Sequence, residues 1–153
     1  MTTHRLKLII DEVDRHLELL NYEEEKLKSE PLNENSLRDY DKLILLDAFI
    51  FRFIKVQSTI GEKLFPHFYE FLTGRPYTEV AFIDILNTLE KYGFLKSAEE
   101  WSRVRKLRNE FVHIYPWETE NKLEAIREAL KLLPFIKETY LRIREYVKQK
   151  MES

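Results

Sequence analysis

The sequence predicts an all-α protein, an up-and-down bundle of about five helices that forms a single domain over residues 1–153. Two observations lead to this prediction. Only 3 Gly and 5 Pro occur in 153 residues, whereas a protein built from short strands needs many turns, and turns depend on those residues. Apolar residues also recur at alternating spacings of three and four, the period of an amphipathic helix.

The first two expected helices cover residues 5–28 and 36–64. The apolar stripe of the first consists of Leu6, Ile10, Val13, Leu17, Leu20 and Leu27. The second is apolar on most of its circumference in its middle, which is typical of a central helix covered on several sides. Pro66 and the turn residues 73–76 then interrupt the pattern, so residues 65–77 are expected to form an aromatic-rich connector.

The third expected helix follows an N-cap at Thr78 and ends at Gly93. Ser97 opens a capping-box pattern, which predicts the start of a fourth helix there. The fourth helix is expected to end near His113, because Pro116 cannot continue it. Its apolar stripe consists of Trp101, Val104, Leu107 and Phe111.

The last expected helix covers residues 119–150 and contains Pro134, which predicts a kink. The most apolar stretch of the chain, residues 43–56, is interrupted by three charged side chains, which indicates a core helix and not a membrane span. The sequence contains no Cys, which excludes disulfides, thiolate metal sites and thiol nucleophiles. There is also no basic-then-apolar leader, so we expect a cytoplasmic protein.

Charge is unevenly distributed along the chain. The net charge is −2, yet residues 1–40 carry 6 basic and 10 acidic side chains, and residues 101–153 carry 12 basic and 8 acidic ones. This balance excludes a protein that binds nucleic acid through its overall charge. It leaves open whether the basic residues of the last helix are a solvated face or line an RNA path.

The most informative chemistry lies between Arg108 and Tyr115. On a helical wheel, Arg108 is about 40° from Val104, at the edge of the apolar stripe, and His113 is about 180° from Val104. An always-charged guanidinium at that edge needs an acidic partner, an anion or an open cleft. Asn109 lies one turn before His113, where its amide could orient the imidazole.

A purely structural interpretation of these residues remains open. Arg108 would pair with a carboxylate, and His113 would cap the end of its helix, where a cationic imidazole is favoured. For His67 the alternatives are packing in the connector and base stacking, and for Arg52 they are an ion pair and a substrate contact. His4 and His16 lack the spacing of metal ligands, so neither a metal nor a cofactor is expected.

The run Gly93-Phe94-Leu95, then Trp101, then Arg108-Asn109-x-x-x-His113-x-Tyr115 resembles the HEPN superfamily. It is most similar to the HEPN member of prokaryotic toxin–antitoxin pairs with a minimal nucleotidyltransferase (MNT). The signature of that family is Arg, four to six residues, then His, often with a polar residue after the Arg and with His-x-Tyr in its toxins. The Pro-Trp after Tyr115 and the aromatic residues 65–77 depart from the family pattern.

The resemblance implies a two-fold homodimer whose Arg–His motifs share a cleft, and a metal-independent endoribonuclease activity. Arg108 would hold the scissile phosphate, His113 would transfer protons and Asn109 would position them. Tyr115 would lie at the cleft edge and receive AMP from the nucleotidyltransferase antitoxin, which silences the toxin. The substrate would be RNA and not DNA, because RNA carries its own nucleophile in the 2′-OH.

Two other functions stay open at this point. The chain could be a non-catalytic substrate-binding module that partners a separate nucleotidyltransferase. It could also be a purely structural dimerisation domain, which would leave the Arg108–His113 pair unexplained.

Overall fold

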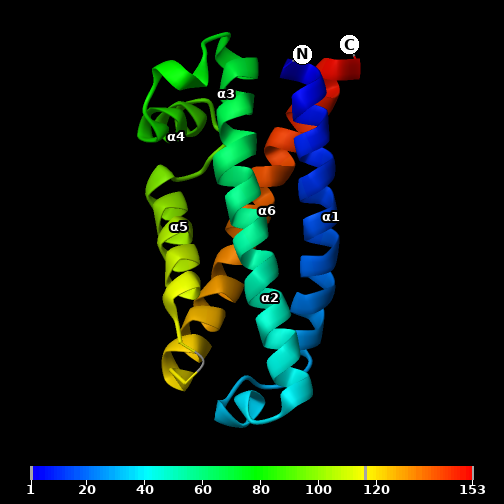
Figure 1. The fold of residues 1–153 in the computed structure, drawn as a ribbon. Coiled ribbons are helices and arrows are strands. Elements are labelled where there is room, and N and C mark those ends of the chain that lie inside the picture. Colours follow the sequence, from blue (N-terminus) through cyan, green and yellow to red (C-terminus); the bar gives the residue numbers. More distant parts are fainter. Residues whose placement is uncertain (1, 116, 153) are drawn as a thin grey trace.

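The computed structural model of the chain describes residues 2–115 and 117–152; Pro116, expected to end the fourth helix, lies outside them. The described residues are all-α, and they pack as an elongated bundle with both termini at the same end (Figure 1). None of the helices in these two ranges is long and apolar enough to cross a membrane.

Six α-helices and three shorter helical segments make up the described part of the bundle. In chain order they are α1 (Thr2–Lys28), η1 (Glu34–Leu37), α2 (Tyr40–Ser58), η2 (Thr59–Leu64), α3 (Phe65–Thr73), η3 (Tyr77–Glu79), α4 (Phe82–Lys91), α5 (Ala98–His113) and α6 (Thr119–Glu152). Because α2, η2 and α3 follow one another without a break, they form one rod (Figure 1). The described chain therefore contains five long helical units, as the sequence predicted.

The prediction that Pro66 breaks the second helix is wrong. The rod continues to Thr73 and ends at Gly74, which has a positive φ of 75°. Pro66 is buried in the first turn of α3, directly after η2, a π-helical turn in which the N–H of Phe65 donates to the carbonyl of Ile60. Since this wider turn already interrupts the α-helical hydrogen-bond series, the missing N–H of proline costs little there. Residues 65–73 are consequently core helix and not a connector.

The π turn also restores the apolar face of the rod. In an uninterrupted α-helix Phe65 would lie about 180° from Val56 around the axis, and the extra residue of a π turn reduces that angle by about 100°. Val56 and Phe65 are accordingly both buried in one core. Gly61 lies inside this turn, where a Cβ atom would come within 3.4 Å of Cζ2 of Trp101. The absence of a side chain at Gly61 thus allows α5 to pack closely on the rod.

The predicted start of α5 is confirmed, and the predicted start of α4 is wrong. Thr78 does not cap α4, because residues 77–79 form the 3-10 turn η3 and the carboxylate of Asp84 accepts the N–H of Ala81 at 3.2 Å instead. Gly93 does end this region with a positive φ of 84°. The hydroxyl of Ser97 accepts the N–H of Glu100 at 3.0 Å, so the predicted start of α5 is confirmed.

The second helix begins later than predicted, at Tyr40 instead of residue 36. The carboxylate of Asp39 accepts the N–H of Asp41 at 3.0 Å and provides its N-cap. The last helix runs through Pro134 without ending, while the kink predicted there stays a prediction.

The two terminal helices are tied together by a polar network. Arg144 of α6 donates to both carboxylate oxygens of Asp14 on α1, at 3.0 and 3.1 Å from Nε. The hydroxyl of Tyr140 lies 2.5 Å from the same carboxylate. Burial and the neighbouring Asp14 raise the pKa of Tyr140 far above its usual range. This phenol therefore stays protonated and serves the fold as a donor.

Candidate functional site

The orientation of α5 is set by its buried stripe. Trp101, Val104, Leu107 and Phe111 are all buried, as predicted. Phe111 packs edge-to-face on Phe53 of α2, with ring centroids 5.4 Å apart, and Trp101 packs on Phe65 at 4.6 Å. Because this stripe faces the core, the edge of α5 that carries Arg108 borders the α2–η2–α3 rod.

Arg108 is half-buried and has no acidic partner. Its Nη1 donates to Oδ1 of Asn109 at 2.9 Å, and its Nε is buried without any hydrogen-bond partner in the described structure. No carboxylate of the described residues pairs with it, unlike Arg103 of the same helix, which pairs with Glu128 at 3.3 Å. The structural interpretation of Arg108 as one half of an ion pair is therefore wrong for this part of the chain.

Arg108 and Asn109 line a cavity of about 300 Å³ between α5 and the rod. The other walls come from Gln57, from the π turn at Gly61 and from Phe82 of α4. A half-buried guanidinium without an acidic partner that borders an open cavity can bind an anion of a ligand. The sequence allowed an acidic partner, an anion or an open cleft beside Arg108, and the structure shows an open cavity there.

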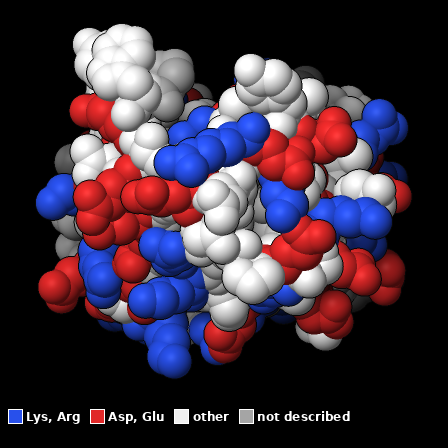
Figure 2. All heavy atoms as spheres, turned by 90° about the horizontal axis from the view of Figure 1, so that it is seen from below, with Lys and Arg blue, Asp and Glu red and all other residues white. Residues whose placement is uncertain are grey.

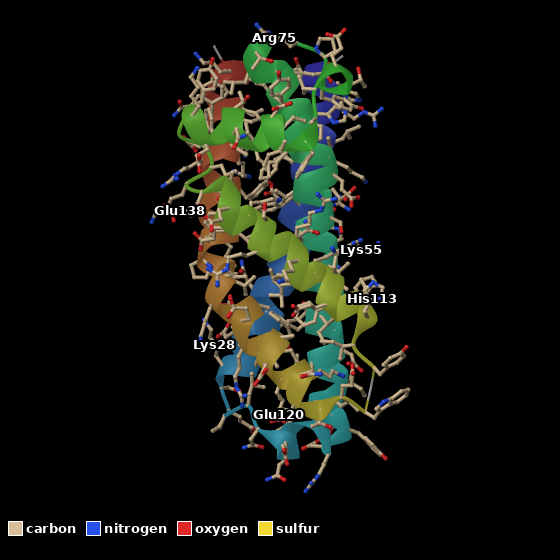
Figure 3. The ribbon with its side chains drawn as sticks, turned by 90° about the vertical axis from the view of Figure 1, so that its left-hand side faces the viewer. Lys28, Lys55, Arg75, His113, Glu120 and Glu138 are labelled. Carbon is tan, nitrogen blue, oxygen red and sulfur yellow. The ribbon has the colours of Figure 1, made fainter. Side chains whose placement is uncertain are left out.

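His113 occupies a different place. It is exposed at the last residue of α5, where the helix dipole favours a cationic imidazole. It lines a groove between α5 and α6 together with Glu110, Glu124 and Glu128, and Figure 3 shows it on the outside of the bundle. Arg108 and His113 thus lie on different sides of α5. The cavity that Arg108 lines does not include His113.

Asn109 does not take the role that its position relative to His113 suggested. Its side-chain oxygen accepts the hydrogen bond from Arg108, so this amide positions the guanidinium and not the imidazole. The local reason is that adjacent residues on the exposed edge of α5 place the two side chains within reach of each other. Asn109 is therefore a positioning residue for Arg108.

Tyr115 lies just beyond α5 and is both stacked and accessible. Its ring is parallel to that of Trp117, with centroids 4.8 Å apart and an interplanar angle of 5°. The side chain is nevertheless 57% exposed. Its backbone N–H donates to Glu118 at 2.9 Å, which fixes the chain at this point. Tyr115 therefore packs against Trp117 and still lies at the surface.

The other candidates have structural partners. His67 lies in α3 and not in a connector; its Nδ1 donates to the carbonyl of Lys63 at 2.8 Å, and its ring contacts Tyr77. Arg52 forms the expected ion pair, with its Nε 3.9 Å from Oε1 of Glu23. Its Nη1 donates to His16 at 3.1 Å. Burial, reinforced by Arg52, lowers the pKa of His16, and burial raises the pKa of Glu23.

Three arginines of the last helix form hydrogen bonds or ion pairs within the chain, and two of its lysines are exposed. Arg127 donates to the carbonyl of Leu32, Arg142 pairs with Glu138, and Arg144 is held by Asp14. Lys131 and Lys148 are exposed. Acidic and basic side chains are interspersed on the end of the bundle seen in Figure 2.

Sequence reasoning missed Gln57 and Gly61 of the rod as well as Phe82 and Arg105, which also line the Arg108 cavity. One signal was present, since Gly61 lies inside the predicted second helix, where glycine is unfavourable. Their proximity to Arg108 depends on tertiary packing and could not be deduced. Among the described residues, no group of three or more His, Asp or Glu side chains is arranged to hold a metal ion.

Comparison of the chain with protein-family models and with curated proteins finds no match. The description of the site therefore depends on its own geometry.

Arg108 has no acidic partner among the described residues, so replacing its side chain should leave the fold intact. We expect Arg108→Met to change the free energy of unfolding by less than about 1 kcal/mol. Arg144→Met should cost about 2 kcal/mol, because it removes the charge-assisted hydrogen bonds to Asp14. Urea unfolding followed by circular dichroism measures both values. A loss at Arg108 as large as at Arg144 would show that Arg108 has a structural partner.

Proposed function

We propose that this chain is a metal-independent endoribonuclease, the HEPN-type toxin of a cytoplasmic toxin–antitoxin pair with a minimal nucleotidyltransferase. The observation that carries the proposal is the half-buried Arg108, which lines an open cavity and has no carboxylate partner among the described residues. A half-buried guanidinium that has no acidic partner and borders a cavity is better explained by an anionic ligand than by a contribution to stability.

The chemistry requires only a proton-transfer group and a phosphate-binding group. Arg108, oriented by Asn109, binds oxygens of the scissile phosphate and stabilises the additional charge of the pentavalent transition state. His113 accepts the proton of the 2′-OH or donates one to the departing 5′-oxygen, since an imidazole can serve as general base or general acid. The products would carry 2′,3′-cyclic phosphate and 5′-hydroxyl ends.

A second copy of the chain is needed to complete this site. Arg108 and His113 lie on different sides of α5, and the exposed His113 has no contact with the Arg108 cavity in one chain. A two-fold dimer would bring the Arg108 of one copy near the His113 of the other and would supply two imidazoles. The dimer thus explains how two diverging side chains can act on one phosphate.

The surface beside the motif has the apolar character that such an interface needs. Ile44 and Phe51 of α2 are 67% and 52% exposed, and they fall on one face of that helix. Val112 of α5, also 52% exposed, adds to the apolar surface of the motif helix. Trp117 follows at 74% exposed. Exposed large apolar side chains of this kind are the ones that a dimer interface would bury.

Tyr115 fits the role of the AMP acceptor. Its ring is held by Trp117 while the side chain stays 57% exposed, so a nucleotidyltransferase could reach the phenol. An adenylyl group there would add bulk and negative charge close to the motif. Both effects would exclude the phosphates of RNA.

The alternative is a non-catalytic module that presents substrate to a nucleotidyltransferase. The separation of Arg108 from His113 in one chain favours this alternative, because a binding module needs no shared cleft. Both functions use the same cavity, and RNA cleavage distinguishes them.

The wild-type chain should cleave a mixed RNA pool in excess chelator, once its intact mass shows that no AMP is attached. His113→Ala and Arg108→Ala should each lower the rate by about 10²-fold or more, because each removes one chemical role. His4→Ala and Arg103→Ala are matched controls outside the motif and should cleave normally. If unmodified wild type leaves RNA whole, the nuclease proposal fails and the binding module becomes the better account.

The dimer should depend on the apolar surface of α2. Phe51→Glu should convert the dimer to a monomer, because it places a charge in the interface. Ile83→Glu on α4 is the matched control, since Ile83 and Phe51 are both 52% exposed. Sedimentation velocity measures the mass, and circular dichroism checks the fold. A wild-type chain that is monomeric at high concentration contradicts the dimer.

Incubation with a minimal nucleotidyltransferase of a HEPN pair and ATP should add one adenylyl group and abolish cleavage. Tyr115→Phe should stay unmodified and active under the same conditions. Tyr92→Phe is the matched control, because Tyr92 is also 57% exposed. Intact-mass spectrometry reads the modification, and its appearance on the Tyr115→Phe chain would place the acceptor elsewhere.

A further inference from the structure

The cavity beside Arg108 extends well beyond what a phosphate needs. It has a volume of about 300 Å³ and is bounded by α2, the π turn, α3, α4 and α5. Cavities of this size hold small organic ligands, whereas a phosphate group needs only a few donors at a surface. The cavity also has a buried polar end and a flat wall, each of which restricts what it can bind.

The polar end is formed by Gln57 and Arg108. Gln57 is only 4% exposed although it carries an amide. The only hydrogen bond of this side chain in the described structure is a long one, accepted from the hydroxyl of Ser58 at 3.5 Å. Its NH₂ group donates to none of the described residues. A glutamine amide without a strong protein partner can form its hydrogen bonds with a ligand in the cavity.

The Gln57 amide packs against the π turn at Gly61. A Cβ atom at Gly61 would lie 3.3 Å from Nε2 of Gln57, so the amide packs over bare backbone one turn along the rod. Single π turns inside α-helices are frequent at functional sites. The buried amide is thus held in a fixed position by the backbone of the rod.

The opposite wall is flat and aromatic. Phe82 is half-buried, and the guanidinium of Arg105 lies over its ring at 5.4 Å from the centroid. Pro66 adds a further apolar surface. Aromatic rings and guanidinium planes are the surfaces on which unpaired bases stack. Glu62 also lines the cavity and would repel a bare anion, which favours a neutral heterocycle over a second phosphate.

We infer that this cavity binds one nucleobase of the substrate RNA, next to the phosphate held by Arg108, and that Gln57 determines its identity. The inference rests on the proposed nuclease function. A glutamine amide offers one acceptor and one donor side by side, which is the complement of the N6 amino group and ring nitrogen of adenine. Adenine is accordingly the expected base.

Binding of free nucleotides tests the cavity without any need for cleavage. Calorimetric titration of the purified, unmodified chain with AMP, GMP, CMP and UMP should show tightest binding of AMP. Gln57→Met keeps the size of the side chain but removes the amide, and should weaken AMP binding about tenfold or more. Gln149→Met, at the other glutamine of the chain, is the matched control and should bind normally. If Gln57→Met fails to fold, the exposed Arg105→Ala should instead weaken binding of all four nucleotides.

Cleavage of oligonucleotides that contain a single ribonucleotide, flanked by each of the four bases in turn, links the cavity to the reaction. Adenine beside the cut should be preferred by the wild type, and Gln57→Met should lose the preference while still cleaving. Equal binding of the four nucleotides, or a preference that Gln57→Met retains, overturns the inference even if RNA is cleaved. AMP binding that depends on Gln57 without any cleavage would support the cavity and refute the nuclease.

Discussion

The burial of Trp101 fixes the position of the motif helix. This side chain is 0% exposed, and its ring lies 4.6 Å from that of Phe65 and 6.4 Å from that of Phe135. It therefore joins α5 to the rod and to α6 at one point, against the bare backbone of Gly61. Its indole N–H has no partner among the described residues, which costs about 1–3 kcal/mol. Burial of a Trp stabilises a fold by about 3–5 kcal/mol, so packing outweighs that cost.

Most of the helices could be predicted from the sequence, because their signals are local. The apolar stripes of α1 and α5, the cap at Ser97 and the positive φ of Gly93 all follow from residues close in the chain. The errors arose where one local signal competed with tertiary packing. Pro66 normally breaks a helix, yet here a π turn precedes it and the core holds the rod together. At α4 two local signals competed instead: the helix begins after Ala81, whose N–H donates to Asp84, and not after Thr78.

The candidate site could be predicted only in part. The wheel placed Arg108 at the edge of the apolar stripe and His113 opposite it, and the structure keeps both positions because one helix determines them. The cavity could not be predicted, since Gln57 and Phe82 lie far from Arg108 in sequence and meet it only through packing. The lack of an acidic partner for Arg108 is also a tertiary property. Arg52 and Arg144 also lie within helices, as Arg108 does, yet both of them pair with carboxylates.

Because of the π turn between Thr59 and Leu64, the packing of the rod depends on the exact number of residues in it, whereas a loop tolerates a change in length. In evolutionary terms such a turn is equivalent to a single-residue insertion that the helix absorbed without ending. Removal of one residue there would leave a continuous α-helix, but would rotate everything beyond it by about 100°. Phe65 would then leave the face that holds Trp101. Insertions and deletions in this chain should therefore be tolerated in the segments at 29–39 and 74–81, while the helical rod keeps a constant residue count.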